Sequence, residues 1–281
     1  MRTTIYSANA PNKSLRHHLR GIVNDLPAAH ELGYRLFKRN LKAQYRQSVL
    51  GFAWALIPPV LTALLWIFLR QNGVMRIADT GISYPVFVFT GTILWQIFSE
   101  AIMSPLRSIN ANKAMLAKIN IPREGLLLSG IYELIFSMVI KLGILALMLV
   151  WFRQEISWQG LLMVPVGLLA MMLSGYAIGL ALTPAGMLFT DVERGIGAIL
   201  PFLMYLTPVI YPRPGSGMLA ALMKINPLAV LLPQTRNWLT AQPPLDMPAF
   251  WIWSGVFLVL FVLSLIVFRL AMPMIIERIG S

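Results

Sequence analysis

Continuous apolar stretches alternate along the chain with short polar and mostly basic segments. A helix needs about 20 apolar residues to cross the hydrocarbon core of a bilayer, and six stretches come close to that length. The pattern therefore predicts six membrane-spanning helices. Their expected ranges are 52–69, 85–103, 126–151, 161–189, 195–211 and 250–268. The fifth is the weakest, since it is short and contains two prolines.

The N-terminal segment differs from the rest because it is polar and basic. Residues 1–26 are interpreted as a loose tail, followed by a helix from about residue 27 to residue 50. At 100° per residue, an apolar stripe of this helix holds Tyr34, Phe37, Leu41 and Tyr45. A second stripe carries four cations, namely Arg35, Arg39, Lys42 and Arg46. This pattern is typical of an interfacial helix, with the cations near lipid headgroups or a lipid-linked substrate. The alternative is a solvated basic helix.

Residues 212–249 are too apolar for a free loop and too broken by Pro227 and Pro233 for one span. Two short re-entrant helices fit best, and backbone at that depth must face protein or a water-filled cavity. The predicted fold is thus an all-α integral membrane protein. It has six transmembrane helices, an N-terminal amphipathic interface helix and outer re-entrant helices between spans five and six. Residues 1–50 form the cytoplasmic part, and residues 51–281 form the six-span domain.

Composition narrows the class of protein. Apolar residues make up 57% of the chain and charged residues only 12%, and the mean hydropathy is +0.70, which excludes a soluble enzyme and a disordered tail. Of the 23 Lys and Arg residues, 16 fall in segments on the side of the N-terminus and six in segments on the other side, and Lys141 lies within a span. This bias predicts a multi-pass protein of the inner (plasma) membrane with both termini in the cytoplasm. The net charge of +12 then points to anionic membrane lipids and not to nucleic acid.

Residues for catalysis or metal binding are scarce. The chain has no cysteine, its three histidines lie within the first 30 residues, and no GxxxxGK[ST] phosphate loop occurs. We therefore expect no catalytic residue, no metal site and no cofactor on this chain. Two ionisable residues, Glu133 and Lys141, fall within the third predicted span. Their spacing of about 12 Å along a helix disfavours a direct pair. We expect each to meet a neighbouring helix, although a functional role stays open.

Aromatic residues are frequent in the predicted spans. Sugar rings stack their C–H faces on aromatic rings, so a conduit for glycans favours aromatics over fixed charges. The candidate residues for such a substrate path are Trp54, Phe87, Phe98, Phe202 and Tyr205. The alternative for each ring is helix packing or lipid contact.

The inner loop 104–125 is polar and basic, yet a helix over residues 108–120 is readable, with Ser108 as its cap and Pro122 after its end. Met115 and Ile119 share one face of it. Such a short amphipathic helix suits the docking of a soluble partner. The alternative is a connecting helix lying on the headgroups.

Four segments resemble the type-2 polysaccharide-export ABC permeases, the family of the O-antigen, capsule and teichoic-acid exporters. They are LKAQYRQSVLGFAWALIPP (41–59), FTDVERG (189–195), LTPVIYP (206–212) and NPLAVLLPQTRNWL (226–239). The resemblance implies a membrane permease subunit of an ATP-driven exporter of lipid-linked polysaccharide. It also implies a homodimer that works with two ATP-binding cassette subunits, which carry the ATP and Mg²⁺. In such a protein the first, second and fifth spans line the channel.

By the same resemblance, the inner loop contains the helix that couples the permease to its ATPase. The coupling residues would be Asn110, Lys113, Met115, Lys118 and Ile119. Two rivals remain. One is an ABC permease of the same fold that exports a drug or a lipid. The other is an integral-membrane transferase that uses a lipid-linked sugar, for which Asp191 and Glu193 are the only close acidic pair.

Overall fold

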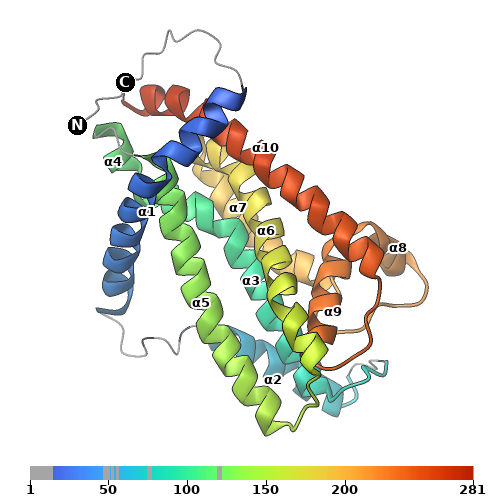
Figure 1. Cartoon of the computed structure of the whole chain (residues 1–281). Coiled ribbons are helices and arrows are strands. Elements are labelled where there is room, and N and C mark those ends of the chain that lie inside the picture. Colours follow the sequence, from blue (N-terminus) through green and yellow to red (C-terminus); the bar gives the residue numbers. More distant parts are fainter. Residues whose placement is uncertain are drawn as a thin grey trace.

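The computed structural model describes residues 15–46, 51, 54, 57–74, 78–118 and 122–280, and the regular elements within these ranges are all helices. The helices are α1 Leu15–Arg46, α2 Ile57–Gln71, α3 Tyr84–Ala111, α4 Lys113–Lys118, α5 Arg123–Trp151, α6 Trp158–Leu188, α7 Thr190–Tyr205, α8 Met218–Ile225, α9 Leu228–Leu239 and α10 Met247–Gly280. Figure 1 shows α3, α5, α6 and α10 running along the long axis of one bundle, with α1 and α4 at the end where both termini lie.

Four helices are long and apolar enough to cross a membrane, namely α3, α5, α6 and α10. They coincide with the second, third, fourth and sixth predicted spans. The α8–α9 pair is bent by 83° and counts as a fifth span only if the pair is taken as one. α2 has 15 residues, or about 22 Å, and α7 has 16. Helix length alone therefore supports four to five spans rather than six.

The fifth predicted span, 195–211, differs most from the observed helix. α7 begins earlier, at Thr190, and ends at Tyr205. Two acidic residues in its first turn, Asp191 and Glu193, suit the positive end of the helix dipole. Beyond Tyr205 the chain forms turns that contain Pro208, and a proline cannot continue a helix without losing a hydrogen bond. Of the first predicted span, residues 52, 53, 55 and 56 lie outside the described part.

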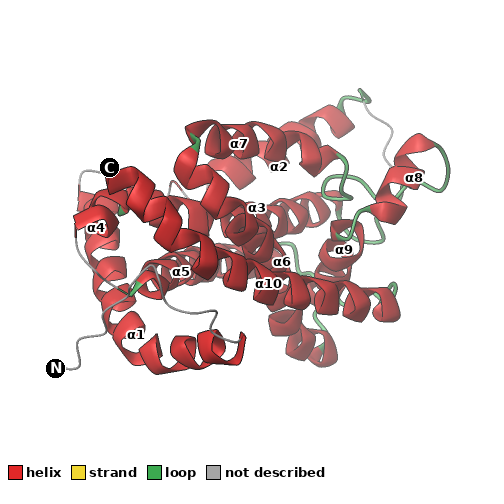
Figure 2. Cartoon of the chain, turned by 90° about the horizontal axis from the view of Figure 1, so that it is seen from above, coloured by secondary structure: helices red, strands yellow, loops and turns green. Residues whose placement is uncertain are grey.

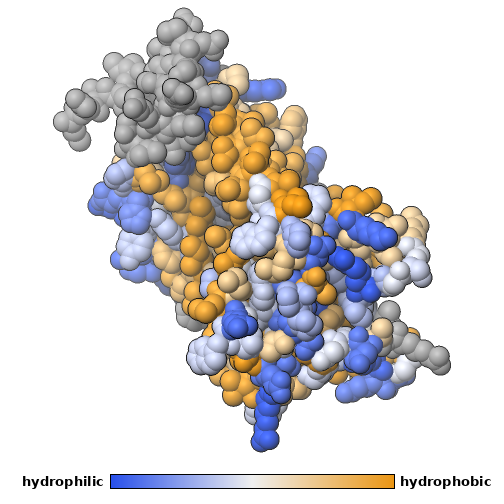
Figure 3. Space-filling model, turned by 45° about the vertical axis from the view of Figure 1, so that its right-hand side comes forward, coloured by the Kyte–Doolittle hydropathy of each residue, from blue (hydrophilic) through white to orange (hydrophobic). Residues whose placement is uncertain are grey.

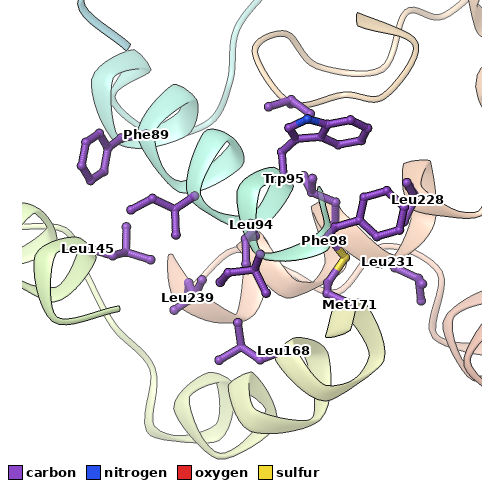
Figure 4. Close-up of a cluster of buried hydrophobic side chains, with 14 of the residues drawn as sticks. Phe89, Leu94, Trp95, Phe98, Leu145, Leu168, Met171, Leu228, Leu231 and Leu239 are labelled. Carbon is purple, nitrogen blue, oxygen red and sulfur yellow. The ribbon is translucent and has the colours of Figure 1, made fainter. Parts of the chain in front are cut away.

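α3 is the central helix of the bundle, and most of its side chains are buried. α6 packs closely on it because α6 carries glycines at the contact. A Cβ atom built at Gly179 would overlap the carbonyl oxygen of Ile102. In Figure 4, the Phe98 ring of α3 lies near Met171 of α6 and near Leu228 and Leu231 of α9.

α1 begins at Leu15, so the helix extends into the segment expected to be a loose tail. Two rings of its aromatic stripe contact α5: the rings of Tyr34 and Tyr132 are 6.5 Å apart, and those of Phe37 and Phe136 are 6.0 Å apart, while the Tyr34 side chain is still 45% exposed. At Gly33 the two backbones approach closely, since a Cβ there would be 2.8 Å from the carbonyl oxygen of Gly125. The contact of this helix with the membrane interface stays a prediction.

The inner loop also differs from the expectation. α3 continues to Ala111, so Ser108 is no N-cap: its hydroxyl donates to the carbonyl of Pro105 at 3.1 Å within α3. Asn112 breaks the helix, and the short α4 follows. The loop helix therefore begins at Lys113, five residues later than expected.

The outer surface of the bundle is largely apolar. Exposed side chains include Val139 and Leu147 of α5 and Leu258 and Val259 of α10. Figure 3 shows a broad apolar surface over the upper part of the molecule, with polar side chains gathered toward its lower end. Monomeric soluble proteins rarely expose apolar patches of this extent, so the surface is that of a protein that lies in lipid.

Candidate functional site

A polar cavity of about 470 Å³ lies between α1, α3 and α5, beside Trp54. Its lining is unusual for a bundle whose cores are apolar. The polar side chains include Glu100 and Ser104 of α3 and Glu133 and Ser137 of α5. Cavities of 300–1,000 Å³ are the usual size of small-molecule sites. This is the candidate binding site on the chain.

An ion pair lies beside the cavity. The ammonium of Lys141 on α5 pairs with the carboxylate of Glu100 on α3, and the hydroxyl of Ser137 donates to the second oxygen of Glu100 at 2.9 Å. The Lys141 side chain is 2% exposed, while that of Glu100 is 39% exposed. A buried ammonium needs a counter-ion because its desolvation is costly. The pair therefore holds α3 and α5 together at this depth.

The other intramembrane acid also finds a partner on a neighbouring helix. Glu133 accepts a hydrogen bond of 2.8 Å from the side-chain amide of Asn40 on α1. Glu133 and Lys141 thus meet α1 and α3, respectively, as the sequence predicts, and not each other. Sequence reasoning missed Glu100 as the partner of Lys141. The signal was present, since Glu100 lies near the inner end of the second predicted span.

The inner loop is tied to the helices that flank it. Asn110 donates to a carboxylate oxygen of Glu193 on α7 at 3.0 Å, and Lys113 donates to the carbonyl of Met187 on α6 at 2.8 Å. Arg107 lies 3.9 Å from the same Glu193 carboxylate. Asn110 and Lys113 therefore connect the loop to both ends of the α6–α7 junction. Glu193, from the FTDVERG segment, is the partner that sequence reasoning did not assign.

The other expected coupling residues are described less fully. Met115 is half-buried and packs against a core formed with α1, α5 and α10. Lys118 is the last residue of α4, and Ile119 lies outside the described residues. The coupling role of the five residues stays a prediction.

The five aromatic candidates do not come together. Phe87 is 7% exposed and Phe98 is 2% exposed, and both lie in the core around α3, where Trp95 lies 5.4 Å from Phe98. Trp54, Phe202 and Tyr205 are exposed. Phe87 and Phe98 are thus in the surroundings that helix packing requires, and a role for the five rings in a substrate path stays a prediction.

The four cations of α1 do not share one environment either. Arg35 pairs with Glu31 one turn earlier at 2.5 Å, and both are exposed. Arg39 donates to Asn112 at the start of the inner loop at 2.9 Å, which sequence reasoning did not foresee. Lys42 and Arg46 are exposed. Contact of these residues with headgroups or a lipid-linked substrate stays a prediction.

A buried arginine at the opposite end of the bundle was also missed. The guanidinium of Arg236 on α9 donates to the carbonyl of Pro208 and lies 3.7 Å from the ring centroid of Phe87. A Cβ at Gly91 would overlap the carbonyl oxygen of Val209, so the turn after α7 also rests directly on α3. Arg236 thereby joins α9, α3 and the turn after α7.

Within the described ranges, no group of three His, Asp or Glu side chains is placed to hold a metal ion. The acidic pair of the transferase hypothesis is split between two environments. Asp191 is exposed and lies 3.8 Å from Arg194, whereas Glu193 is engaged by Asn110.

The family described as "ABC-2 type transporter" matches residues 32–239, which include the cavity and the inner loop. The O-antigen export system permease protein RfbA of Klebsiella pneumoniae is 27% identical over 219 residues, 74% of this chain and 82% of that protein. RfbA of Myxococcus xanthus is 26% identical over 214 residues, covering 75% and 81%. The polysialic acid transport protein KpsM of Escherichia coli is 24% identical over 190 residues, covering 63% and 68%.

Proposed function

Because the chain belongs to the ABC-2 type transporter family, we propose that it is the membrane permease subunit of an ATP-driven exporter of lipid-linked polysaccharide. The observation that carries the proposal is the family match together with the relatives' names. The relatives are named for O-antigen export or polysialic acid transport, and both cargoes are polysaccharides. A bundle of long apolar helices is the structure such a subunit needs.

In this proposal the chain spans the inner membrane six times, through α2, α3, α5, α6, α7 and α10. Both termini lie in the cytoplasm, and the bent α8–α9 pair enters the outer leaflet. The charge distribution along the sequence supports this orientation. α2 and α7 are short for full spans. Two short helices that line a path between protein copies need not cover the whole lipid thickness, since the bilayer thins locally.

The subunit is proposed to work as a homodimer that meets through α2 and α7. These helices carry exposed apolar residues such as Leu64 and Phe68 on α2 and Phe202 on α7. They meet where the rings of Trp66 and Tyr205 are 6.0 Å apart, and Figure 2 shows both helices on the same side of the bundle. A second copy on this face would place the exposed Phe202 and Tyr205 next to the glycan path. Phe87 and Phe98, which are buried, would then pack behind the residues that line the path.

Two ATP-binding cassette subunits are proposed to dock on the inner loop, carrying the ATP and Mg²⁺ themselves. The supporting geometry is the pair of contacts from Asn110 to Glu193 and from Lys113 to Met187. A displacement of α4 would pass through these contacts to α6 and α7. Rigid helices would then convert ATP-driven movement at the loop into opening of the dimer.

The experiment is deletion of the gene, followed by measurement of surface polysaccharide and of lipid-linked glycan in the membrane. We expect the surface glycan to disappear and lipid-linked glycan to accumulate. The chain purified from complemented cells should carry an ATP-hydrolysing subunit at equal copy number. Unchanged surface glycan would refute the proposal, and altered drug or lipid efflux alone would favour the first rival. Turnover of lipid-linked sugar by the purified chain without ATPase would establish the transferase.

A further inference from the structure

We propose that the cavity between α1, α3 and α5 binds a neutral, hydroxyl-rich sugar unit of the exported lipid-linked glycan. The inference rests on the proposed function and adds a site to it, away from the α2–α7 face. It depends on three properties of the cavity: unused hydrogen-bonding groups, aromatic surface, and the balance of charge.

Hydrogen-bonding capacity is left over in the lining. The Ser104 hydroxyl is buried and has no hydrogen-bond partner within the described part of the chain. Glu133 uses one carboxylate oxygen for Asn40, and each carboxylate oxygen can accept two hydrogen bonds. Unpaired buried polar groups are costly and therefore rare in native proteins. A guest with several hydroxyl groups would satisfy both residues, since a hydroxyl both donates and accepts.

Two aromatic residues complete the lining. Trp54 is 60% exposed and lines the cavity together with Phe136 of α5. A ring that presents an apolar C–H face to an indole and hydroxyl groups to carboxylates and serines matches this combination. A purely apolar guest would leave the second carboxylate oxygen of Glu133 without a donor, and ordered water would leave the aromatic surface wet.

The charges argue against a phosphate or pyrophosphate guest. The lining contains two carboxylates, Glu100 and Glu133, and one guanidinium, Arg107. Arg107 already lies near Glu193, and Lys141 is paired with Glu100. An anion needs donors and unpaired positive charge, whereas the cations near this lining already face carboxylates. The sugar portion therefore fits the cavity better than the phosphate-bearing anchor.

The position of the cavity gives the bound sugar a route to the coupling loop. Asn40, which binds Glu133, is the neighbour of Arg39, and Arg39 donates to Asn112 before α4. A sugar that binds Glu133 would therefore lie beside Asn40, whose neighbour Arg39 is bonded to that loop. Sugar binding in the cavity and docking of the ATPase would thus both act on the C-terminal part of α1.

The test measures binding to the full chain in lipid nanodiscs. The probes are oligosaccharides released by mild acid from the cell's own surface polysaccharide, and the readout is saturation-transfer NMR with a Trp-fluorescence titration. Ser104→Ala and Glu133→Gln should each weaken binding at least fivefold. Ser99→Ala is the matched control, because Ser99 lies on the same helix, bonds to the carbonyl of Trp95 and lies outside the lining. It should bind as the unchanged protein does.

Trp54→Ala provides a variant at an exposed position, in case a cavity variant fails to fold. It should weaken binding and remove most of the fluorescence change. Absence of binding, or equal binding by all variants, would overturn the inference. Stronger binding of inorganic pyrophosphate or of tetramethylammonium than of the oligosaccharides would overturn it too. If surface glycan depends on the gene but no oligosaccharide binds, only the cavity assignment fails. If the glycan does not depend on the gene, the proposed function itself fails.

Discussion

The Glu100–Lys141 pair predicts an asymmetric response to mutation. Lys141 is almost fully buried, whereas Glu100 faces the polar cavity and keeps a hydrogen bond from Ser137. Glu100→Gln therefore leaves an ammonium without a counter-ion in an apolar bundle, at a cost of about 3–5 kcal/mol in the free energy of unfolding. Lys141→Met leaves a carboxylate that still has a donor and access to the cavity. It should cost only about 1–2 kcal/mol.

The double variant sharpens the comparison. With both charges removed, no buried charge is left unpaired, so Glu100→Gln with Lys141→Met should be more stable than Glu100→Gln alone. The two single effects should therefore fail to add, as expected of residues in contact. Unfolding in mixed micelles with increasing SDS, followed by helical circular dichroism, measures all three variants. Lys224→Met, at an exposed position on α8, is the control and should be neutral.

The reasoning would be refuted by a loss in Lys141→Met as large as that in Glu100→Gln. It would equally be refuted if the two single losses added up in the double variant. Either result would mean that the two side chains do not compensate each other's charge.

Three further predictions concern the packing, the outer end and the coupling loop. Gly179→Ala should lower the free energy of unfolding by about 1–3 kcal/mol in the same assay, because its Cβ overlaps the Ile102 carbonyl. Gly143→Ala, whose Cβ has no neighbour within 4 Å, is the control and should be neutral or stabilising. Arg236→Lys should cost about 1–3 kcal/mol, since an ammonium cannot reproduce the planar contact with Phe87 and the bond to Pro208; stability equal to that of the unchanged protein would contradict this. Asn110→Ala should lower surface glycan about tenfold through loss of one bond to a charged group, with the ATPase subunit still co-purifying. Asn72→Ala, an exposed position that bonds within its own segment, should leave export unchanged, and equal export by both variants would argue against the Asn110 contact as a coupling element.

The candidate site shows where sequence reasoning ended. Glu133 and Lys141 stood out because ionisable residues are rare within spans, and the helical rise already disfavoured a direct pair. Their partners Asn40 and Glu100 come from α1 and α3, which are distant in sequence. No periodicity within one helix identifies which neighbour it will face. The cavity likewise forms only where three helices meet, so no single segment of the sequence predicts it.

The helix boundaries show the same division. The ends of α5 and α6 agree with the apolar pattern to within a few residues, because long apolar stretches have one stable state in lipid. The start of α1, the continuation of α3 to Ala111 and the end of α7 do not. At these ends, local capping, proline and packing compete with hydrophobicity.

By itself, the sequence determined the class of protein, the number and order of the apolar stretches and the family to which the four segments point. These properties depend on transfer of side chains between water and lipid, which each stretch decides independently of the others. Only the tertiary structure decided that the Tyr34 and Phe37 rings of α1 contact α5, that Phe87 and Phe98 lie in the core, and that Lys141 meets Glu100. Those outcomes depend on which helix surfaces meet, and that choice is made by packing and charge compensation among segments distant in the chain.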